Sequence, residues 1–379
     1  MTTRMKQMPA QIEKVLLVQL VVGRRSRTEA EDSLNELEKL AETVGAVVTG
    51  RITQRKDKPS VSLLVGEGKL FDIQSACRET GANTIIFDND LSAVQVNNLD
   101  LALGVKVIDR TELILQIFAR RALSAEAQIQ VELAQLQYMV SRMPVSEKQH
   151  RFDGGIGMRG PGESPLSLRN EPMRRRIKDL KIKLNAIQSR RERRNARRKW
   201  PLVSLVGYTN AGKSTLLNAF TEAGAYVDDR LFATLDTKTR RVYLPNGKSV
   251  LMTDTVGFIR HLPHGLVASF RSTLSVASES ALLLIVADAS SSQIDEHLKI
   301  VKQTLDEINA GNVPSLLILN KCDVPAAKDA LSRLMSSYPG AIPVSALQRN
   351  GLMKVKQFVM DNVYAHYPHD KISHIEAHY

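Results

Sequence analysis

Eight residues, Gly207-Tyr208-Thr209-Asn210-Ala211-Gly212-Lys213-Ser214, match the pattern G-x-x-x-x-G-K-[ST]. The apolar run 202–206 before them predicts a buried strand, and residues 214–220 after them predict the first turns of a helix. A strand, a glycine loop and a helix N-terminus together cradle phosphate, because backbone N–H groups point inward and the helix end is partly positive. The alternative, a glycine turn ahead of an ordinary helix, is disfavoured because both flanking elements are in place.

The side chains of this loop have separate expected tasks. We expect Lys213 to reach the β- and γ-phosphates of a nucleotide and the Ser214 hydroxyl to hold a magnesium ion. The predicted nucleotide contacts in the loop are Gly207, Tyr208, Thr209, Asn210, Ala211, Gly212, Lys213, Ser214 and Thr215.

Three further motifs follow in the order that a GTPase requires. In Asp254-Thr255-Val256-Gly257, the carboxylate would support magnesium through water and the Gly257 N–H would meet the γ-phosphate. In Asn320-Lys321-Cys322-Asp323, Asp323 can accept from guanine N1 and the exocyclic amine, which adenine cannot match. An ATP-using P-loop enzyme, the runner-up, does not explain Asp323. Ser345-Ala346-Leu347 would support the base from a later loop. The predicted contacts therefore include Asp254, Gly257, Asn320, Lys321, Asp323, Ser345, Ala346 and Leu347.

Composition suggests a cytoplasmic protein with an anionic partner. The 379 residues allow two or three domains, and 52 Lys+Arg against 40 Asp+Glu give a net charge of +12. Two cysteines cannot form a disulfide framework and fit a reducing compartment. We expect no transmembrane segment, because the longest apolar runs are far too short to span a bilayer.

Residues 12 to about 110 alternate between strand-like and helix-like segments. Strands are predicted at 15–22, from 47, at 84–87 and at 105–108. Helices are predicted between them at 68–80 and 91–103, and another where Leu34, Leu37, Leu40 and Val44 recur at helical spacing before Gly45. This alternation predicts a small α/β domain with a largely parallel sheet. Gly66-Glu67-Gly68-Lys69, between a strand-like run and a helix, could hold a phosphate or be a bland turn, and both interpretations stay open.

Residues 124–199 predict an antiparallel helical hairpin. Apolar residues recur at spacings of four and three from Ile129 to Met143 and again from Met173 to Ile187. The joining segment, 144–172, is rich in Gly and Pro, and loops of that length are usually functional or disordered. Residues 174–199 carry 13 Lys/Arg against two acidic residues. A solvated helical face is the alternative, but this concentration of charge favours a nucleic-acid surface that contacts the phosphates of folded RNA.

The region from residue 200 predicts a nucleotide-binding domain. A hairpin with an Asn-Gly turn is expected over 241–253, strands at 282–286 and 316–319, and helices at 293–308 and 351–364. The fold class is α/β: an N-terminal α/β domain (1–122), an antiparallel helical hairpin with a Gly-rich loop (123–199), a C-terminal P-loop GTPase domain with a mainly parallel sheet (200–366), and a tail (367–379).

The chain resembles the HflX-type ribosome-associated GTPases, a group of translation-factor-related P-loop GTPases, over nearly its whole length. The resemblance covers Gly66-Glu67-Gly68-Lys69, the hairpin, the loop Arg159-Gly160-Pro161-Gly162-Glu163 and the GTPase motifs. Phe232-Ala233-Thr234-Leu235-Asp236 is similar to the first switch of the family, so Thr234 would be its magnesium-sensing threonine. The resemblance implies GTP hydrolysis to GDP and phosphate, with Lys213, Thr234 and Gly257 as catalytic residues and Ser214, Thr234 and Asp254 at Mg²⁺.

The family also implies a partner. Its members bind the large ribosomal subunit, through ribosomal RNA, and dissociate stalled or idle ribosomes. We expect that function here, in a monomeric cytoplasmic protein. A GTP-dependent signalling module that acts on another protein or at an anionic membrane surface, through the basic helix, stays open as the alternative.

Several residues depart from the family pattern or are ambiguous. Pro165 and Pro172 replace a polar run and are expected to delay the start of the second hairpin helix. Thr237-Lys238 stands where the family often has Pro-Thr. Asn210 matches a position that holds K⁺ in related GTPases, although a loop-stabilising hydrogen bond explains it equally well. Phe258 follows Gly257 where many GTPases carry a water-orienting Gln, so slow unassisted hydrolysis is expected.

Overall fold

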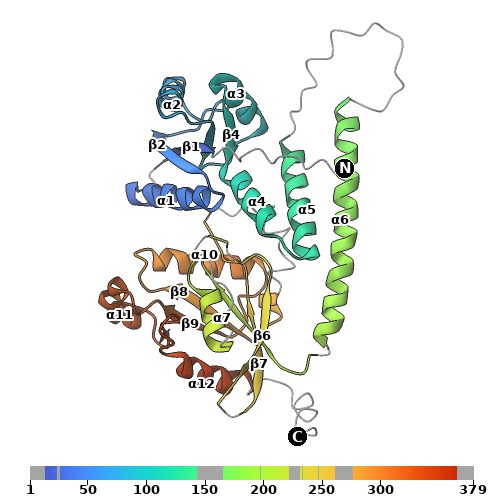
Figure 1. The fold of residues 1–379 in the computed structure, drawn as a ribbon, viewed down its shortest axis with the longest axis vertical. Coiled ribbons are helices and arrows are strands. Elements are labelled where there is room, and N and C mark those ends of the chain that lie inside the picture. Colours follow the sequence, from blue (N-terminus) through green and yellow to red (C-terminus); the bar gives the residue numbers. More distant parts are fainter. Residues whose placement is uncertain are drawn as a thin grey trace, which may run out of the picture. The chain divides into compact units, whose positions relative to one another are not determined.

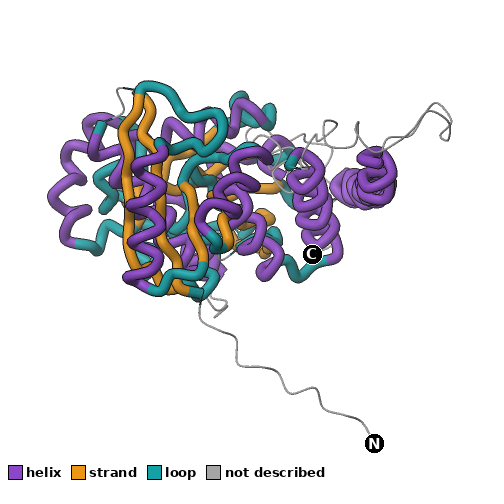
Figure 2. Tube along the Cα trace, turned by 90° about the horizontal axis from the view of Figure 1, so that it is seen from above, coloured by secondary structure: helices purple, strands orange, loops and turns teal. Residues whose placement is uncertain are grey.

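The computed structural model describes residues 13–23, 26–142, 165–196, 198–221, 231–232, 234–245, 247–260 and 276–364. These residues divide into two compact units (Figure 1). One contains 1–120 and 134–178, and the other contains 121–133 and 179–379. In each unit the strands form one sheet with helices packed beside it (Figure 2). None of the described helices is both long and apolar enough to cross a membrane.

The first unit contains a four-stranded parallel sheet with strand order β2-β1-β3-β4, as the alternating pattern predicted. Strand β1 lies inside the sheet, so its run from Val15 to Val21 is buried on both faces. The elements are β1 (Lys14–Val22), α1 (Arg27–Thr43), β2 (Val47–Lys56), α2 (Glu67–Thr80), β3 (Thr84–Phe87), α3 (Ala93–Leu103), β4 (Lys106–Asp109) and α4 (Arg110–Arg121), of which α4 was not predicted.

The ends of these helices follow from local side-chain chemistry. Ser26 and Ser92 begin α1 and α3 with capping boxes, in which each serine accepts from the backbone three residues on. The strand-like interpretation of the run before Gly66 is wrong. Residues 60–65 form a turn closed by hydrogen bonds between Ser60 and Leu64, and Gly66 is the N-cap of α2 without a capping side chain.

Helices α5 (Ala125–Ser141) and α6 (Pro165–Ala196) form the predicted hairpin. Arg191, near the end of α6, lies 3.5 Å from Glu126 in the first turn of α5, so the two helices run antiparallel. The expectation that the prolines delay α6 is wrong. Pro165 is its first residue, where no backbone N–H is needed, and Pro172 lies inside the helix. Residues 143–164, which hold most of the predicted Gly-rich loop, lie outside the described part of the chain.

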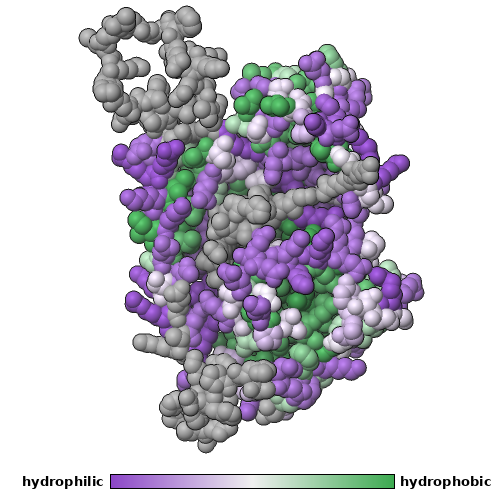
Figure 3. Space-filling view, turned by 180° about the vertical axis from the view of Figure 1, so that it is seen from behind, coloured by the Kyte–Doolittle hydropathy of each residue, from purple (hydrophilic) through white to green (hydrophobic). Residues whose placement is uncertain are grey.

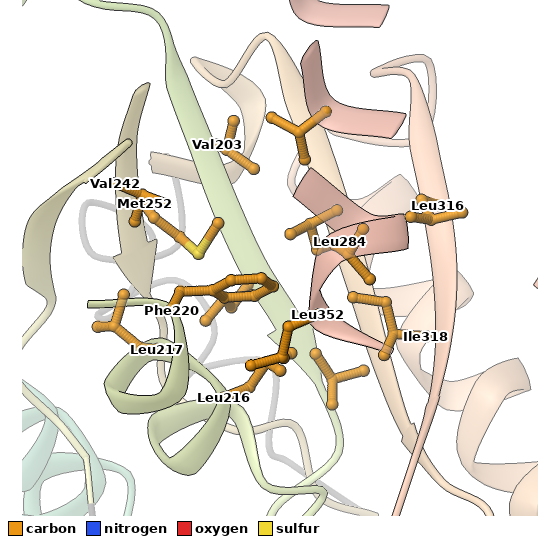
Figure 4. Close-up of a cluster of buried hydrophobic side chains, with 14 of the residues drawn as sticks. Val203, Leu216, Leu217, Phe220, Val242, Met252, Leu284, Leu316, Ile318 and Leu352 are labelled. Atoms are coloured by element: carbon orange, nitrogen blue, oxygen red, sulfur yellow. The ribbon is translucent and has the colours of Figure 1, made fainter. Parts of the chain in front are cut away.

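The second unit contains a six-stranded sheet of order β10-β9-β8-β5-β7-β6, in which only β6 pairs antiparallel. Apolar side chains from the strands and from α7 and α12 pack into one core, which includes Val203, Phe220, Met252, Leu284 and Leu352 (Figure 4). In this unit the predicted β-hairpin (β6 and β7), strands and helices are confirmed, whereas α11 and β10 were not predicted. The bounds are β5 (Leu202–Gly207), α7 (Lys213–Thr221), β6 (Lys238–Tyr243), β7 (Ser249–Asp254), β8 (Leu282–Asp288), α10 (Ile294–Glu307), β9 (Ser315–Asn320), α11 (Pro325–Ser337), β10 (Ile342–Pro343) and α12 (Leu352–Val363).

Candidate nucleotide-binding site

The loop between β5 and α7 has a backbone that only glycine permits at two positions. A Cβ on Gly207 would lie 2.2 Å from the carbonyl oxygen of Val286 on the neighbouring strand. Gly212 has a φ of +91°, and a Cβ there would lie 2.3 Å from Asn320 Nδ2. The two glycines of the motif therefore serve close packing against β8 and β9 as well as the turn itself.

Lys213 is the first residue of α7, directly after the loop, and is 7% exposed. Its Nζ donates to the carbonyl oxygens of Gly207 at 3.1 Å and Tyr208 at 2.8 Å, so the ammonium is held beneath the loop. Burial lowers the pKa of Lys213 to about 8, and the nearby Asp254 carboxylate opposes that shift. Among the described residues, Lys213 Nζ makes its hydrogen bonds to two neutral carbonyl oxygens, and a buried cation bonded in this way suits an anionic ligand.

The three predicted magnesium residues lie together. Ser214 Oγ donates to Asp254 Oδ2 at 2.6 Å and lies 2.8 Å from Thr234 Oγ1. Asp254 is fully buried, and burial raises its pKa while Lys213 lowers it. Asp254 Oδ1 is buried and has no hydrogen-bond partner among the described residues. Two hydroxyls and a carboxylate oxygen are the hard donors that Mg²⁺ prefers.

The segment after Asp254 lies directly over the glycine loop. A Cβ on Gly257 would lie 2.9 Å from Lys213 Nζ and 2.8 Å from the Cα of Thr209, so no side chain fits there. Thr209 N donates to the Phe258 carbonyl at 2.8 Å, and Phe258 N donates to that of Gly207 at 3.1 Å. The Phe258 ring is 2% exposed and packed away from solvent.

The residues predicted to read the base lie at the ends of β9 and β10. Asn320 Nδ2 donates to the Ala211 carbonyl at 2.9 Å, and its Oδ1 accepts from Ala346 N at 3.1 Å. One side chain thus joins the phosphate loop to the later loop. Ser345 Oγ donates to Asp323 Oδ1 at 2.6 Å, which orients that carboxylate. Leu347 is 78% exposed beside them.

Some of the predicted contacts have partners that the sequence did not reveal. Lys321 Nζ lies 2.7 Å from Asp288 Oδ2 at the end of β8. Because β8 is the neighbour of β5 and β9, an aspartate at its carboxyl end could have been found from the strand order. Tyr208 stacks on His297 with ring centroids 3.9 Å apart, and its hydroxyl accepts from Arg260 N at 2.9 Å. No sequence signal pointed to this pair.

The remaining predicted contacts occupy the edges of the site. Asn210 has a φ of +59° and is exposed, and its side chain makes no hydrogen bond within the described part of the chain. The alternative of a loop-stabilising bond therefore has no support there. Thr215 lies in the first turn of α7 and is partly exposed.

Fold and site together define a P-loop GTPase that carries a separate α/β domain and a helical hairpin. Residues 31–119 match the family "GTP-binding GTPase N-terminal", residues 121–198 match "GTP-binding GTPase Middle Region", and residues 202–321 match "50S ribosome-binding GTPase". The chain belongs to the HflX family of GTPases, and it binds and hydrolyses GTP.

Two relatives and one solved structure illustrate the match. GTPase HflX of Caldanaerobacter subterraneus subsp. tengcongensis is 45% identical over 324 residues, which are 84% of this chain and 75% of that protein. GTPase HflX of Escherichia coli (strain K12) is 45% identical over 338 residues, which are 88% and 79% of the two chains. The crystal structure of the complex of SsGBP and GDP superposes with a TM-score of 0.51 at 27% identity, covering 93% of this chain and 99% of that one.

Proposed function

We propose that this GTPase binds the large ribosomal subunit through ribosomal RNA and helps to dissociate or rescue ribosomes. The observation that carries the proposal is the exposed basic surface of α6. The match of residues 202–321 to a family described as a 50S ribosome-binding GTPase adds support. The signalling module at an anionic membrane or on another protein has no comparable observation in its favour.

Charge and burial divide α6 into two sides. Leu180 is 1% exposed, whereas the lysines and arginines of the described part of the helix are mostly exposed. Hydrophilic side chains project from this helix along the left side of Figure 3. Arg191 is an exception, because its side chain is 14% exposed and paired with Glu126. The surface proposed to contact RNA phosphates is therefore made by Arg174, Arg175, Arg176, Lys178, Lys181, Lys183, Arg190 and Arg193.

The experiment is co-sedimentation of the full chain with purified large subunits in GTP, GDP and a non-hydrolysable analogue, over a series of salt concentrations. If about six phosphates are contacted, affinity falls on the order of a thousandfold between roughly 50 and 200 mM salt. A variant with Ala at Lys181, Lys183, Arg190 and Arg193 should bind more weakly and with a shallower salt dependence. Its nucleotide affinity should be unchanged.

A matched control removes the same charge elsewhere. Lys299, Lys302, Lys328 and Lys354 are exposed on α10, α11 and α12, and their replacement by Ala should leave subunit binding intact. Association that ignores salt, or equal loss in both variants, would refute the assignment of α6. Binding to anionic liposomes but not to subunits would establish the membrane alternative instead.

Within the site, we propose that Ser214, Thr234 and Asp254 hold Mg²⁺, with the unpartnered Asp254 Oδ1 accepting from a water of the ion. Bound Mg²⁺ neutralises charge on the phosphate oxygens. Lys213 and the Gly257 N–H would bind the β- and γ-phosphates, and Asp323, oriented by Ser345, would accept from guanine. We also propose that exposed Asn210 is a K⁺ ligand. The ion would add positive charge beside the phosphates.

Phe258 bears on how hydrolysis is triggered. Its buried ring has no donor or acceptor to orient water, so the isolated protein should turn over at about 10⁻⁴ to 10⁻³ per second, as unassisted small GTPases do. We propose that the large subunit stimulates the rate by ordering the Thr234 and Phe258 segments. Single-turnover hydrolysis with and without large subunits, on the wild type and Phe258→Gln, is the measurement. Fast turnover by the protein alone would refute ribosomal triggering.

The division into domains 1–122, 123–199, 200–366 and a tail, the monomeric state and the cytoplasmic location are likewise proposals. Sedimentation at micromolar concentration would test the monomer, and fractionation of cells would test the location.

A further inference from the structure

Asp236, two residues after Thr234, contacts the start of helix α5. Its Oδ2 accepts from the backbone N of Leu123 at 3.0 Å and of Ser124 at 3.1 Å, and its Oδ1 accepts from the Ser124 hydroxyl. The partners are 112 and 113 residues apart in sequence, yet both belong to the same compact unit. A carboxylate with three donors at a helix N-terminus is a favourable charge arrangement.

Ser124 uses its hydroxyl in both directions. The oxygen accepts from Ala127 N at 3.1 Å, and the Ser124 carbonyl accepts from Gln128 N at 2.9 Å, so Ser124 is the N-cap of α5. The same hydroxyl donates to Asp236. The next turn of α5 is fixed in place, because Ala127 is 1% and Gln130 0% exposed. The N-terminus of α5 is thus held in place by its cap and by packing, and Asp236 bonds to it.

The other end of this connection is the proposed magnesium site. Thr234 Oγ1 lies 2.8 Å from Ser214 Oγ, and between Thr234 and Asp236 the Leu235 side chain is 1% exposed. Residues 234–237 belong to no helix or strand, so their position depends on such tertiary contacts. The segment 234–236 is therefore held at three consecutive residues: by the hydroxyl contact of Thr234, by the burial of Leu235 and by the carboxylate contacts of Asp236.

We propose that Ser124 and the N-terminus of α5 act as a positioning group for GTP hydrolysis, because they hold Asp236 and through it place Thr234 at the nucleotide. The hairpin thereby contributes to a reaction whose other residues all come from the GTPase region. By thermodynamic linkage, a nucleotide that draws Thr234 inward must also stabilise the start of α5. The inference rests on the role proposed for Thr234 and not on the ribosomal partner.

The test is single-turnover GTP hydrolysis by the full chain without ribosomes. Ser124→Ala removes the hydroxyl donor but keeps both backbone donors, so at saturating GTP the rate should fall about three- to tenfold. Asp236→Asn loses the charge and should fall further. Ser124→Thr keeps the hydroxyl and should restore the rate. GDP affinity should be unchanged in all three, because the γ-phosphate side of the site is the one affected.

Ser92→Ala is the matched control, since it removes the serine cap of α3 without touching the GTPase unit, and it should hydrolyse GTP at the wild-type rate. Hydrogen exchange at residues 124–131 should slow when a GTP analogue replaces GDP, and Asp236→Asn should abolish that difference. A Ser124→Ala rate equal to that of Ser92→Ala would overturn the proposal, as would failure of Ser124→Thr to rescue.

Thr234→Ala distinguishes the role proposed for Thr234 itself from the positioning role proposed for Ser124. If it slows hydrolysis while Ser124→Ala does not, only the positioning role fails. If Thr234→Ala hydrolyses GTP at the wild-type rate, the role proposed for Thr234 fails and the positioning role falls with it.

Discussion

Asn320 bonds to both the phosphate loop and the base-reading loop, so its truncation tests how the two loops are held. It is 1% exposed, donates to the Ala211 carbonyl and accepts from Ala346 N. Asn320→Ala would leave a buried carbonyl and a buried N–H without partners. Asn320→Asp, nearly the same size, could still accept from Ala346 but would place an oxygen against the Ala211 oxygen.

The magnitude follows from these two bonds. Each buried group left unsatisfied costs about 1–3 kcal/mol. Asn320→Ala should therefore destabilise the native arrangement of the two loops by roughly 3 kcal/mol. GDP must then reorder both loops on binding, and its affinity should fall between about tenfold and a hundredfold. Asn320→Asp should bind at least as weakly, because a charge would also be buried.

Fluorescence titration with a labelled GDP measures the affinity, and a thermal melt of each variant checks that the fold persists. Asn362→Ala is the control, because Asn362 lies on α12 and its side chain donates to the Phe358 carbonyl of its own helix. If Asn320→Ala binds GDP within about twofold of Asn362→Ala, a difference below 0.5 kcal/mol, the two loops are not held together by this side chain.

Three further predictions concern the nucleotide itself. Asp323→Asn should lose about tenfold to a hundredfold in GTP affinity and gain xanthosine nucleotides, since a lost bond to a charged partner is worth ~1.5–3 kcal/mol; an unchanged GTP titration would remove the guanine assignment. Hydrolysis should be faster in KCl than in NaCl at equal ionic strength, and Asn210→Ala should erase the difference; equal wild-type rates exclude a K⁺ role. Burial lowers the pKa of Lys213 in the free protein to about 8, so its ammonium loses a proton as pH rises through that value. GDP affinity should therefore fall between about pH 7 and 9. A GDP affinity that does not change with pH over this range contradicts the phosphate role of Lys213.

The sequence predicted the elements whose signals are local. Strand β5 and the loop after it follow from an apolar run and two glycines. Strand β3 was predicted with its observed bounds, because a short run of apolar and β-branched residues is typical of a buried strand. The run 61–65 was misleading, since an apolar run of that length also fits a turn packed on α2 and α3. Helix α11 was missed although Pro325 stands at its first turn, a common start signal.

Pro172 shows the opposite error. A proline inside a helix lacks one hydrogen bond and crowds the preceding turn, so sequence reasoning placed the start of α6 later than it is. The helix nevertheless runs through Pro172 from Pro165 to Ala196, and Leu180 further along it is buried. Packing of a long helix against its partner outweighs one local defect.

The contacts that give the site its connections are those that no local signal records. Asn320 and Ala211 are 109 residues apart, and Asp236 and Ser124 are 112 apart. Compactness also groups residues 121–133 of the hairpin with the GTPase region, so the path from Thr234 through Asp236 to α5 stays inside one unit. If Thr234 meets the γ-phosphate as proposed, a change there would reach the start of α5 through the buried Leu235 and the hydrogen bonds of Asp236. That path would make the basic surface of α6 sensitive to the bound nucleotide, as GTP-dependent binding to the proposed ribosomal RNA partner requires.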